Sequence, residues 1–214
     1  MKNVILIGDS IRINYDKYVQ NRLRNTTNVF FPNDNCRFAH YILRHIGEWL
    51  EKSGFMGNID VIHWNAGLHD VVHMYGEGAL VPIEWYAETI ERVYKVMKKL
   101  APEAKQIFAT STCVIEEGFT EPERFYRKNA DIEAYNQAAI QRLSKYGDVV
   151  INDLYTLTKE APREIFSDPT HFYTEPGRKL LGDRVSQIIA QQLQVELDDL
   201  DGYDTATGKL YIGQ

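Results

Sequence analysis

The chain has 214 residues, of which 24 are Lys or Arg and 30 are Asp or Glu, so its formal net charge is −6 at pH 7. This length suits one domain with a full core and is short for two domains of ordinary size. The acidic balance, without a run of basic residues, argues against nucleic acid as a partner. No apolar stretch approaches the ~20 residues of a membrane span, and the N-terminal residues lack the pattern of a signal peptide. We therefore expect a cytoplasmic protein with no membrane partner.

Two cysteines, Cys36 and Cys113, are too few for a disulfide framework and lack Cys-x-x-Cys spacing, so buried free thiols are expected. The His, Cys and carboxylate residues show no spacing typical of a metal site. No glycine-rich phosphate loop follows a predicted strand. The sequence therefore predicts chemistry that needs neither a metal nor a cofactor.

Strand-like apolar runs alternate with segments of helical periodicity. The runs lie at residues 3–8, 28–31, 59–64, 105–111 and 148–151. This alternation predicts an α/β domain over residues 1–197, with a five-stranded parallel sheet and helices on both faces, a doubly wound three-layer α/β/α arrangement.

Four of the connecting helices have clear sequence signals. From Phe38 to Leu50, apolar residues recur at helical spacing along one continuous face. Pro82 is expected to open the next helix, and Asp131 is expected to be the N-cap of the following one. The last helix is predicted to begin near Thr174, with Pro176 in its first turn.

Two connections, residues 71–81 and 113–130, are longer than βα units require. Extra loop at the carboxyl end of a parallel sheet usually shapes a site, so His73 and Tyr126 are candidates for lining or supporting a substrate cleft. Residues 198–214 form an acidic, turn-rich tail. Within it, residues 207–212 are compatible with a short edge strand or with contact to a second subunit of a homo-oligomer.

The first predicted strand leads directly into Gly8-Asp9-Ser10. Catalytic groups in open α/β sheets lie at the carboxyl ends of the strands, so Ser10 is placed where a nucleophile is needed. Asp-Ser is also an ordinary turn or N-cap pair, and the tripeptide alone does not decide between these interpretations.

Asp168-Pro169-Thr170-His171 supplies the two partners that a serine nucleophile requires. The offset of three residues allows the Asp168 carboxylate to reach the His171 imidazole within one turn, which leaves the other ring nitrogen for Ser10. The alternative is a turn before a helix in which Asp168 accepts backbone amides and His171 lies on the surface.

The third expected strand ends in Trp64-Asn65-Ala66-Gly67-Leu68-His69-Asp70. Gly67 suits close approach of the backbone to a substrate, and a donor two residues later is placed to point at an oxyanion. A plain βα turn, with His69 or Asp70 capping a helix, is the alternative.

Together these segments resemble the GDSL/SGNH hydrolases, esterases and acetylesterases of flavodoxin-like fold, from Ile5 to about Leu193. The resemblance implies that Ser10 is the nucleophile, His171 the base and Asp168 the acid, with the Ser10 N–H in the oxyanion hole. Where the family has Gly-x-Asn-Asp, this chain has Gly67-Leu68-His69-Asp70. An imidazole N–H also donates hydrogen bonds, so His69 is expected in the place of the asparagine.

The family's second motif is a glycine whose backbone N–H donates to the same oxyanion, and residues 33–37 contain no glycine. Any non-proline residue carries this N–H, so Asn35, Cys36 and Arg37 all qualify, and Cys36 is the residue we expect. Cys36 as the nucleophile is disfavoured. Asp9 is expected to hydrogen-bond neighbouring loops, and Asp70 is expected to organise its own turn.

The expected activity is hydrolysis of carboxylic esters through an acyl-enzyme, with short acyl groups such as acetyl on a carbohydrate or small molecule as the preferred substrate. A lysophospholipase or thioesterase of the same family is the alternative enzyme. A non-catalytic ligand-binding module on the same fold is the alternative outside catalysis, since two motifs depart from the family pattern.

Overall fold

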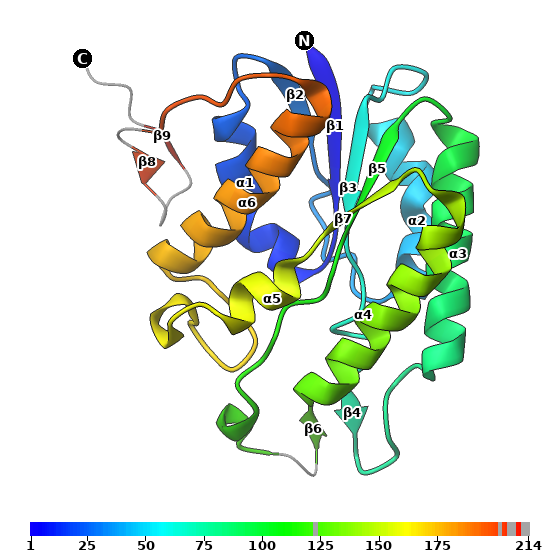
Figure 1. The fold of residues 1–214 in the computed structure, drawn as a ribbon, viewed down its shortest axis with the longest axis vertical. Helices are drawn as coiled ribbons and strands as arrows, with labels where there is room; N and C mark the ends of the chain where they lie inside the picture. Colours follow the sequence, from blue (N-terminus) through cyan, green and yellow to red (C-terminus); the bar gives the residue numbers. More distant parts are fainter. Residues whose placement is uncertain (122–123, 201–202, 205–208, 211–214) are drawn as a thin grey trace.

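The computed structural model describes residues 1–121, 124–200, 203–204 and 209–210. Its centre is a five-stranded sheet in the order β2-β1-β3-β5-β7, in which every neighbouring pair is parallel (Figure 1). The strands are β1 (Lys2–Ile7), β2 (Thr27–Phe30), β3 (Val61–Trp64), β5 (Lys105–Ala109) and β7 (Val149–Asn152). All five predicted strands are confirmed, with ends shifted by at most two residues.

Helices cover both faces of this sheet (Figure 1). On one face lie α1 (Ser10–Arg22) and α6 (Glu175–Leu193), and on the other α2 (Ala39–Lys52), α3 (Ile83–Leu100) and α4 (Asn129–Leu143). A strand covered on both faces needs apolar side chains throughout, and Val4 to Ile7 of β1 are all 0% exposed. The predicted doubly wound α/β/α fold is thus confirmed.

The strand order reverses direction between β1 and β3. The chain moves from β1 to β2 on one side and then crosses back to place β3 on the other. Loops leave such a switch point on opposite faces, which opens a crevice at the carboxyl ends of the two strands. Ser10 follows β1 and His69 follows β3, so the fold brings their two segments to the same crevice.

Two predicted helix starts have different outcomes. Thr174 is the N-cap of α6, and its side chain accepts a hydrogen bond from the Gly177 N–H. Asp131 is not the N-cap of α4, because the helix already begins at Asn129 and Asp131 lies in its first turn. Its carboxylate instead contacts His73 at 2.8 Å. The prediction for Asp131 was wrong since this partner lies 58 residues away in the sequence.

The sequence analysis missed two small elements. One is the short helix α5 (Leu154–Lys159), whose N-cap is Asp153. The other is an antiparallel ribbon of β4 (His73–Met74) and β6 (Phe125–Tyr126), which pairs the two long connections with each other beyond the end of α4 (Figure 1).

The segment that follows α6 packs against the end of α1 and the turn after it. The Asp198 N–H donates to the Arg22 carbonyl at 2.8 Å, and its carboxylate accepts from the Asn25 N–H at 3.0 Å. Position 198 is therefore packed against the domain. Beyond it, β8 (Tyr203–Asp204) pairs antiparallel with β9 (Lys209–Leu210) rather than with the main sheet. The other residues of the predicted 207–212 strand lie outside the described part.

Both cysteines are buried and free, as the sequence predicts. None of the helices within the described residues is long and apolar enough to cross a membrane.

Candidate active site

Ser10 is the first residue of α1 and stands directly above the carboxyl end of β1. Asp9, fully buried, is the N-cap: its carboxylate accepts from the Ile11 N–H at 2.9 Å and from the Asn65 side-chain amide at 3.1 Å. Asp9 thus links the ends of β1 and β3, the supporting role expected of it. The Ser10 N–H lies at the N-terminus of α1, where the helix dipole favours a negatively charged group.

Gly8 is required by close packing at this turn. A Cβ on Gly8 would lie 2.0 Å from Asn65 Oδ1 and 2.7 Å from Arg12 Cβ, both buried side chains. Only glycine lets the chain turn from β1 into α1 at this point.

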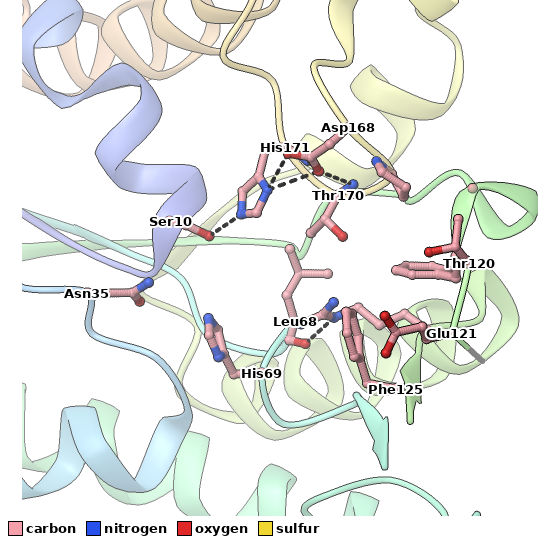
Figure 2. Close-up of a pocket in the computed structure, with 14 residues that line it drawn as sticks. Ser10, Asn35, Leu68, His69, Thr120, Glu121, Phe125, Asp168, Thr170 and His171 are labelled. Atoms are coloured by element: carbon pink, nitrogen blue, oxygen red, sulfur yellow. Dashed lines mark hydrogen bonds and ion pairs between the residues drawn. The ribbon is translucent and has the colours of Figure 1, made fainter. Parts of the chain in front are cut away.

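Ser10, His171 and Asp168 form one continuous hydrogen-bonded chain. Ser10 Oγ lies 2.9 Å from His171 Nε2, and His171 Nδ1 lies 2.8 Å from Asp168 Oδ2 (Figure 2). The carboxylate selects the tautomer with hydrogen on Nδ1, which leaves the Nε2 lone pair for the serine hydroxyl. The three residues that the sequence predicted are therefore in contact in the arrangement that a serine nucleophile needs.

The turn before α6 holds Asp168 ionised. Burial acts to raise the pKa of Asp168, but N–H groups of Thr170 and His171 and the His171 ring together lower it. The two backbone donors lie 2.8 and 2.9 Å from Oδ1. Both alternatives for this turn thus occur together: Asp168 accepts backbone amides and also orients His171.

His171 has a further neighbour that the sequence analysis missed. The Tyr173 ring stacks on the imidazole with centroids 5.2 Å apart and an interplanar angle of 21°. Its hydroxyl donates to the Ser10 carbonyl at 3.4 Å. Tyr173 therefore restricts the rotation of His171. The sequence does show an aromatic residue two positions after His171. This spacing alone does not indicate stacking, because stacking depends on side-chain geometry that the motif does not specify.

His69 lies across the pocket from His171, beneath Ser10 (Figure 2). The preceding Gly67 has φ +146°, a conformation essentially restricted to glycine, and a Cβ there would lie 2.3 Å from Ser111 Oγ. This turn leads His69 into the pocket. Burial lowers the pKa of His69. The negative charge of Asp9 acts to raise it, but the nearby charges of Arg127, Arg37 and His171 lower it further. A neutral imidazole with one N–H results at neutral pH.

The loop after β2 corrects one prediction. The Cys36 N–H donates to the Gly8 carbonyl at 3.1 Å, so it is not available to an oxyanion, and the choice of Cys36 was wrong. The Arg37 N–H donates to Asn35 Oδ1 at 3.0 Å and is also engaged. Asn35 lines the pocket, and its N–H has no acceptor among the described residues. Asn35 is therefore the residue of this loop best placed to donate, and Figure 2 shows it beside Ser10.

Arg12 holds this loop in place. Its side chain is buried, forms an ion pair with Asp16 at 2.6 Å, and donates to the Asp34 carbonyl. Because Arg12 is on α1, two residues after Ser10, the nucleophile and the Asn35 loop share one support. Cys36 itself is fully buried, and burial raises the pKa of its thiol to about 11. A protonated, inaccessible thiol is a poor nucleophile, in agreement with the preference for Ser10.

Asp70 does more than organise its own turn, the role expected of it, because its carboxylate supports the start of α2 from a distance. It is fully buried, and both carboxylate oxygens accept from the Ala39 N–H, at 3.1 and 3.2 Å. Phe38, the N-cap residue, provides no side-chain hydrogen bond of its own. Burial raises the pKa of Asp70 to about 7, which the Ala39 hydrogen bond only partly opposes.

The pocket has a volume of about 490 Å³ and opens above Ser10. The described residues that line it are Ser10, Asn35, Leu68, His69, Gly118, Phe119, Thr120, Glu121, Phe125, Arg127, Asp168, Pro169, Thr170 and His171. One wall comes from the long connection after β5, where Phe119 and Phe125 meet edge to face at 6.3 Å. The sequence analysis pointed to this connection by its length but did not identify Phe119 or Thr120.

His73 and Tyr126 do not line the pocket. They stack on each other across the β4–β6 ribbon, with centroids 4.7 Å apart and an interplanar angle of 18°. Their role is to support the ribbon that carries Phe125, so of the two functions considered for them the structure favours support. Arg37 is likewise absent from the lining, and its guanidinium lies over the Tyr41 ring.

Among the described residues, no three His, Cys, Asp or Glu side chains are grouped so as to hold a metal ion. The chemistry available in the pocket is that of the residues already named: a serine oriented by an imidazole, a carboxylate behind the imidazole, and N–H donors on the opposite side.

No protein-family model matches this sequence, and no curated protein matches it either. Solved structures do match. A lipase/acylhydrolase from Enterococcus faecalis aligns with a TM-score of 0.69 at 18% identity over 93% of this chain and 100% of that chain. The acetyl xylan esterase AlAXEase gives 0.68 at 17% identity over 87% and 99%. Axe2, an acetylxylan esterase from Geobacillus stearothermophilus, gives 0.65 at 16% identity over 91% and 95%.

At these identities the likeness concerns the fold. The class that the sheet order defines is the flavodoxin-like α/β/α proteins. Within that class, the fold of this chain is similar to the folds of this lipase/acylhydrolase and of these acetyl xylan esterases.

Proposed function

We propose that this protein is a serine esterase that hydrolyses carboxylic esters through an acyl-enzyme. The observation that carries the proposal is the unbroken chain from Ser10 Oγ through His171 to Asp168, with contacts of 2.9 and 2.8 Å, at the floor of a pocket. Esterases and acylhydrolases among the structural neighbours support the same reaction class.

In the proposed reaction, Ser10 Oγ attacks the ester carbonyl while His171 Nε2 accepts the hydroxyl proton. Asp168 stabilises the imidazolium through Nδ1–H. The tetrahedral oxyanion is bound by the N–H groups of Ser10 and Asn35 and by the His69 side chain. His171 then donates its proton to the departing alkoxide, which leaves the acyl group on Ser10.

Water completes the cycle. His171 Nε2 removes a proton from a water molecule, which attacks the acyl carbonyl and forms a second tetrahedral oxyanion in the same hole. Collapse of this intermediate expels Ser10 Oγ, which takes the proton from His171, and the carboxylic acid leaves.

We further propose that the natural acyl group is short. The pocket of about 490 Å³ combines hydroxyl, amide and charged groups with one phenylalanine wall, which suits a small acyl ester of a carbohydrate or other small molecule. Two of the similar structures are acetylxylan esterases, which supports acetyl as the first group to test.

The test compares hydrolysis of 4-nitrophenyl acetate, butyrate and octanoate by the wild type, Ser10→Ala and Ser144→Ala. Ser144 is an exposed serine outside the pocket and serves as the matched control. We expect activity that falls with acyl length, disappears in Ser10→Ala and persists in Ser144→Ala. A serine-directed fluorophosphonate should label only proteins that retain Ser10.

A preference for octanoate would instead favour a lysophospholipase or thioesterase. Absence of both turnover and fluorophosphonate labelling in the folded wild type would contradict catalysis and favour a ligand-binding module.

A further inference from the structure

Arg127 presents a positive charge to the pocket that the proposed reaction does not use. It follows β6 directly and lines the pocket together with Ser10 and His171. Its Nε donates to the Leu68 carbonyl at 2.5 Å, so the guanidinium is anchored on the loop that carries His69. The anchor uses one of five N–H donors and leaves the two terminal nitrogens for another partner.

The described part of the chain supplies no such partner. Within it, no carboxylate forms an ion pair with Arg127, and no acceptor other than Leu68 contacts its guanidinium. Burial acts to lower the pKa of Arg127, and only the more distant charges of Asp9 and Asp168 oppose this effect. A half-buried guanidinium without a counterion is costly, so an anion from outside the chain would be favoured there.

The negative groups of the pocket are already occupied. Asp168 is bound by His171 and by two backbone amides. Glu121, on the rim, forms an ion pair with Arg124 at 3.3 Å. Of the described residues that line the pocket, Arg127 is the only Lys or Arg. The pocket therefore offers a fixed cation beside the nucleophile without a fixed anion competing for it.

We propose that Arg127 determines substrate specificity by binding an anionic group, such as a carboxylate, on the ester that Ser10 cleaves. This inference rests on the proposed esterase function. A guanidinium with two free terminal nitrogens matches the two oxygens of a carboxylate, a geometry that lysine does not reproduce. The substrate class is thus a short ester of an acidic small molecule or acidic sugar.

The test uses esters that differ mainly in charge. Monoethyl succinate is compared with ethyl butyrate, which places the anion in the acyl part. 4-Acetoxybenzoate is compared with methyl 4-acetoxybenzoate, which places it in the leaving group. Each pair is measured with the wild type, Arg127→Gln, Arg127→Lys and Lys128→Gln. Lys128→Gln removes an equal charge from the neighbouring position, at an exposed side chain outside the pocket lining.

We expect the wild type to prefer the charged ester in one of the two pairs. Arg127→Gln should lower the ratio of kcat/KM for that ester to kcat/KM for its neutral counterpart by about 10- to 100-fold, the effect of losing a hydrogen bond to a charged group, on top of any loss that both esters share through the Leu68 anchor. Arg127→Lys should recover part of the preference, and Lys128→Gln should keep it. Equal losses for charged and neutral esters, or no charge preference in an active wild type, would overturn the inference while leaving the esterase proposal intact.

A binding measurement separates the two proposals. Titration of uncleaved monoethyl succinate and 4-acetoxybenzoate into Ser10→Ala and Ser10→Ala/Arg127→Gln reports anion recognition without turnover. Tighter binding by the single variant supports the role of Arg127 even if no ester is hydrolysed. Equal binding to both contradicts it, whatever the wild-type activity.

Discussion

His69 is the residue at which this site departs most from the resemblance that predicts it. An asparagine side chain donates without titrating, whereas an imidazole donates one N–H when neutral and two when protonated. Burial and the charges of Arg127 and Arg37 lower the pKa of His69, so the neutral form prevails at neutral pH. The neutral imidazole still has one N–H to donate to the proposed oxyanion, and its lowered pKa makes it a weak base beside His171.

Replacing His69 tests its place in the oxyanion hole. Loss of one such donor typically reduces kcat by about 10²- to 10³-fold, so His69→Ala should fall in this range, with KM for 4-nitrophenyl acetate changed far less. His69→Asn should recover much of the loss because an amide can donate from the same position. Full activity in His69→Ala would mean that the oxyanion is bound elsewhere.

The sequence predicts the side chains of the site better than its backbone donors. Ser10, Asp168 and His171 could be identified because their chemistry resides in side chains at recognisable spacings. The backbone donor in the loop after β2 could not be identified from the sequence, because every non-proline residue carries an N–H. Only the structure shows that the Cys36 N–H is bound to Gly8 and that Asn35 is the residue of this loop that lines the pocket.

Among the elements, the turn after β3 depends on Gly67. Its φ of +146° is unfavourable for any residue with a Cβ, and a Cβ would also meet the buried Ser111 hydroxyl at 2.3 Å. Strain at such positions costs on the order of 1–3 kcal/mol. Gly67→Ala should therefore lower the free energy of unfolding by at least that amount and reduce esterase activity by displacing His69.

Gly147→Ala is the control for this turn. Gly147 also has positive φ, +70°, but a Cβ added there would meet no atom within 4 Å, and the residue is remote from the pocket. Chemical denaturation should show a loss of about 1–2 kcal/mol in this control, with unchanged kcat/KM. Equal effects of the two substitutions on stability and activity would contradict the specific role of Gly67.

The raised pKa of Asp70, which caps α2, predicts that the stability of the folded protein depends on pH. Its pKa is raised from 3.8 to about 7 in the folded chain, so between these values the folded state retains a proton that the unfolded state has released. Stability from this group is present below pH ~4 and is lost as the pH rises toward 7, by an amount on the order of a few kcal/mol. Asp70→Asn removes this dependence.

Thermal unfolding between pH 4.5 and 8 checks the sign. The Tm of Asp70→Asn relative to the wild type should increase with pH. Asp60→Asn is the control: burial acts to raise the pKa of Asp60, but its bonds to Lys2 and the Asn3 N–H lower it overall, so Asp60 is ionised in the folded and unfolded states above pH ~4 and its Tm difference should stay flat over this range. A flat Tm difference for Asp70→Asn would show that Asp70 is ionised in the folded protein throughout this range.

Local and long-range contacts explain which helix caps could be predicted from the sequence and which could not. Thr174 caps the helix that directly follows it, so the local sequence contains the signal. The α2 N-terminus is capped by Asp70, 31 residues further on, and Asp131 is drawn to His73 across 58 residues. Contacts of this kind depend on the tertiary fold, and no local pattern indicates them.

At the scale of the whole molecule, the β4–β6 ribbon joins two connections and holds Phe125 in one wall of the pocket. The contact of 2.8 Å between His73 and Asp131 ties this ribbon to α4. Asp131→Asn should weaken the tie, raise KM for 4-nitrophenyl esters by several-fold and leave kcat within about 2-fold. The global cost should stay below about 1 kcal/mol, as for other partly exposed ion pairs.

Glu133→Gln is the matched control, because Glu133 lies on the same helix and pairs with Lys159 at 2.7 Å, away from the ribbon. Steady-state kinetics of this variant should equal those of the wild type. A similar KM increase in both variants would indicate that α4 as a whole, rather than the ribbon, affects substrate binding.

The parallel sheet, its five strands and the three-layer arrangement could be predicted from periodicity, because buried strands and amphipathic helices each leave a regular apolar pattern. The ribbon could not, since two-residue strands have no period.

The contact between Ser10 and His171 spans 161 residues. During synthesis from the N-terminus, the nucleophile is made early, but its base is added only with the turn before α6. The β1–β2–β3 core can form before then, whereas the proposed ester hydrolysis has to wait until α6 has left the ribosome and packed beside α1 (Figure 1). Catalysis would therefore begin only when the fold is complete. Nascent chains that stall before α6 would contain the strands of the sheet but would lack the base that makes Ser10 reactive.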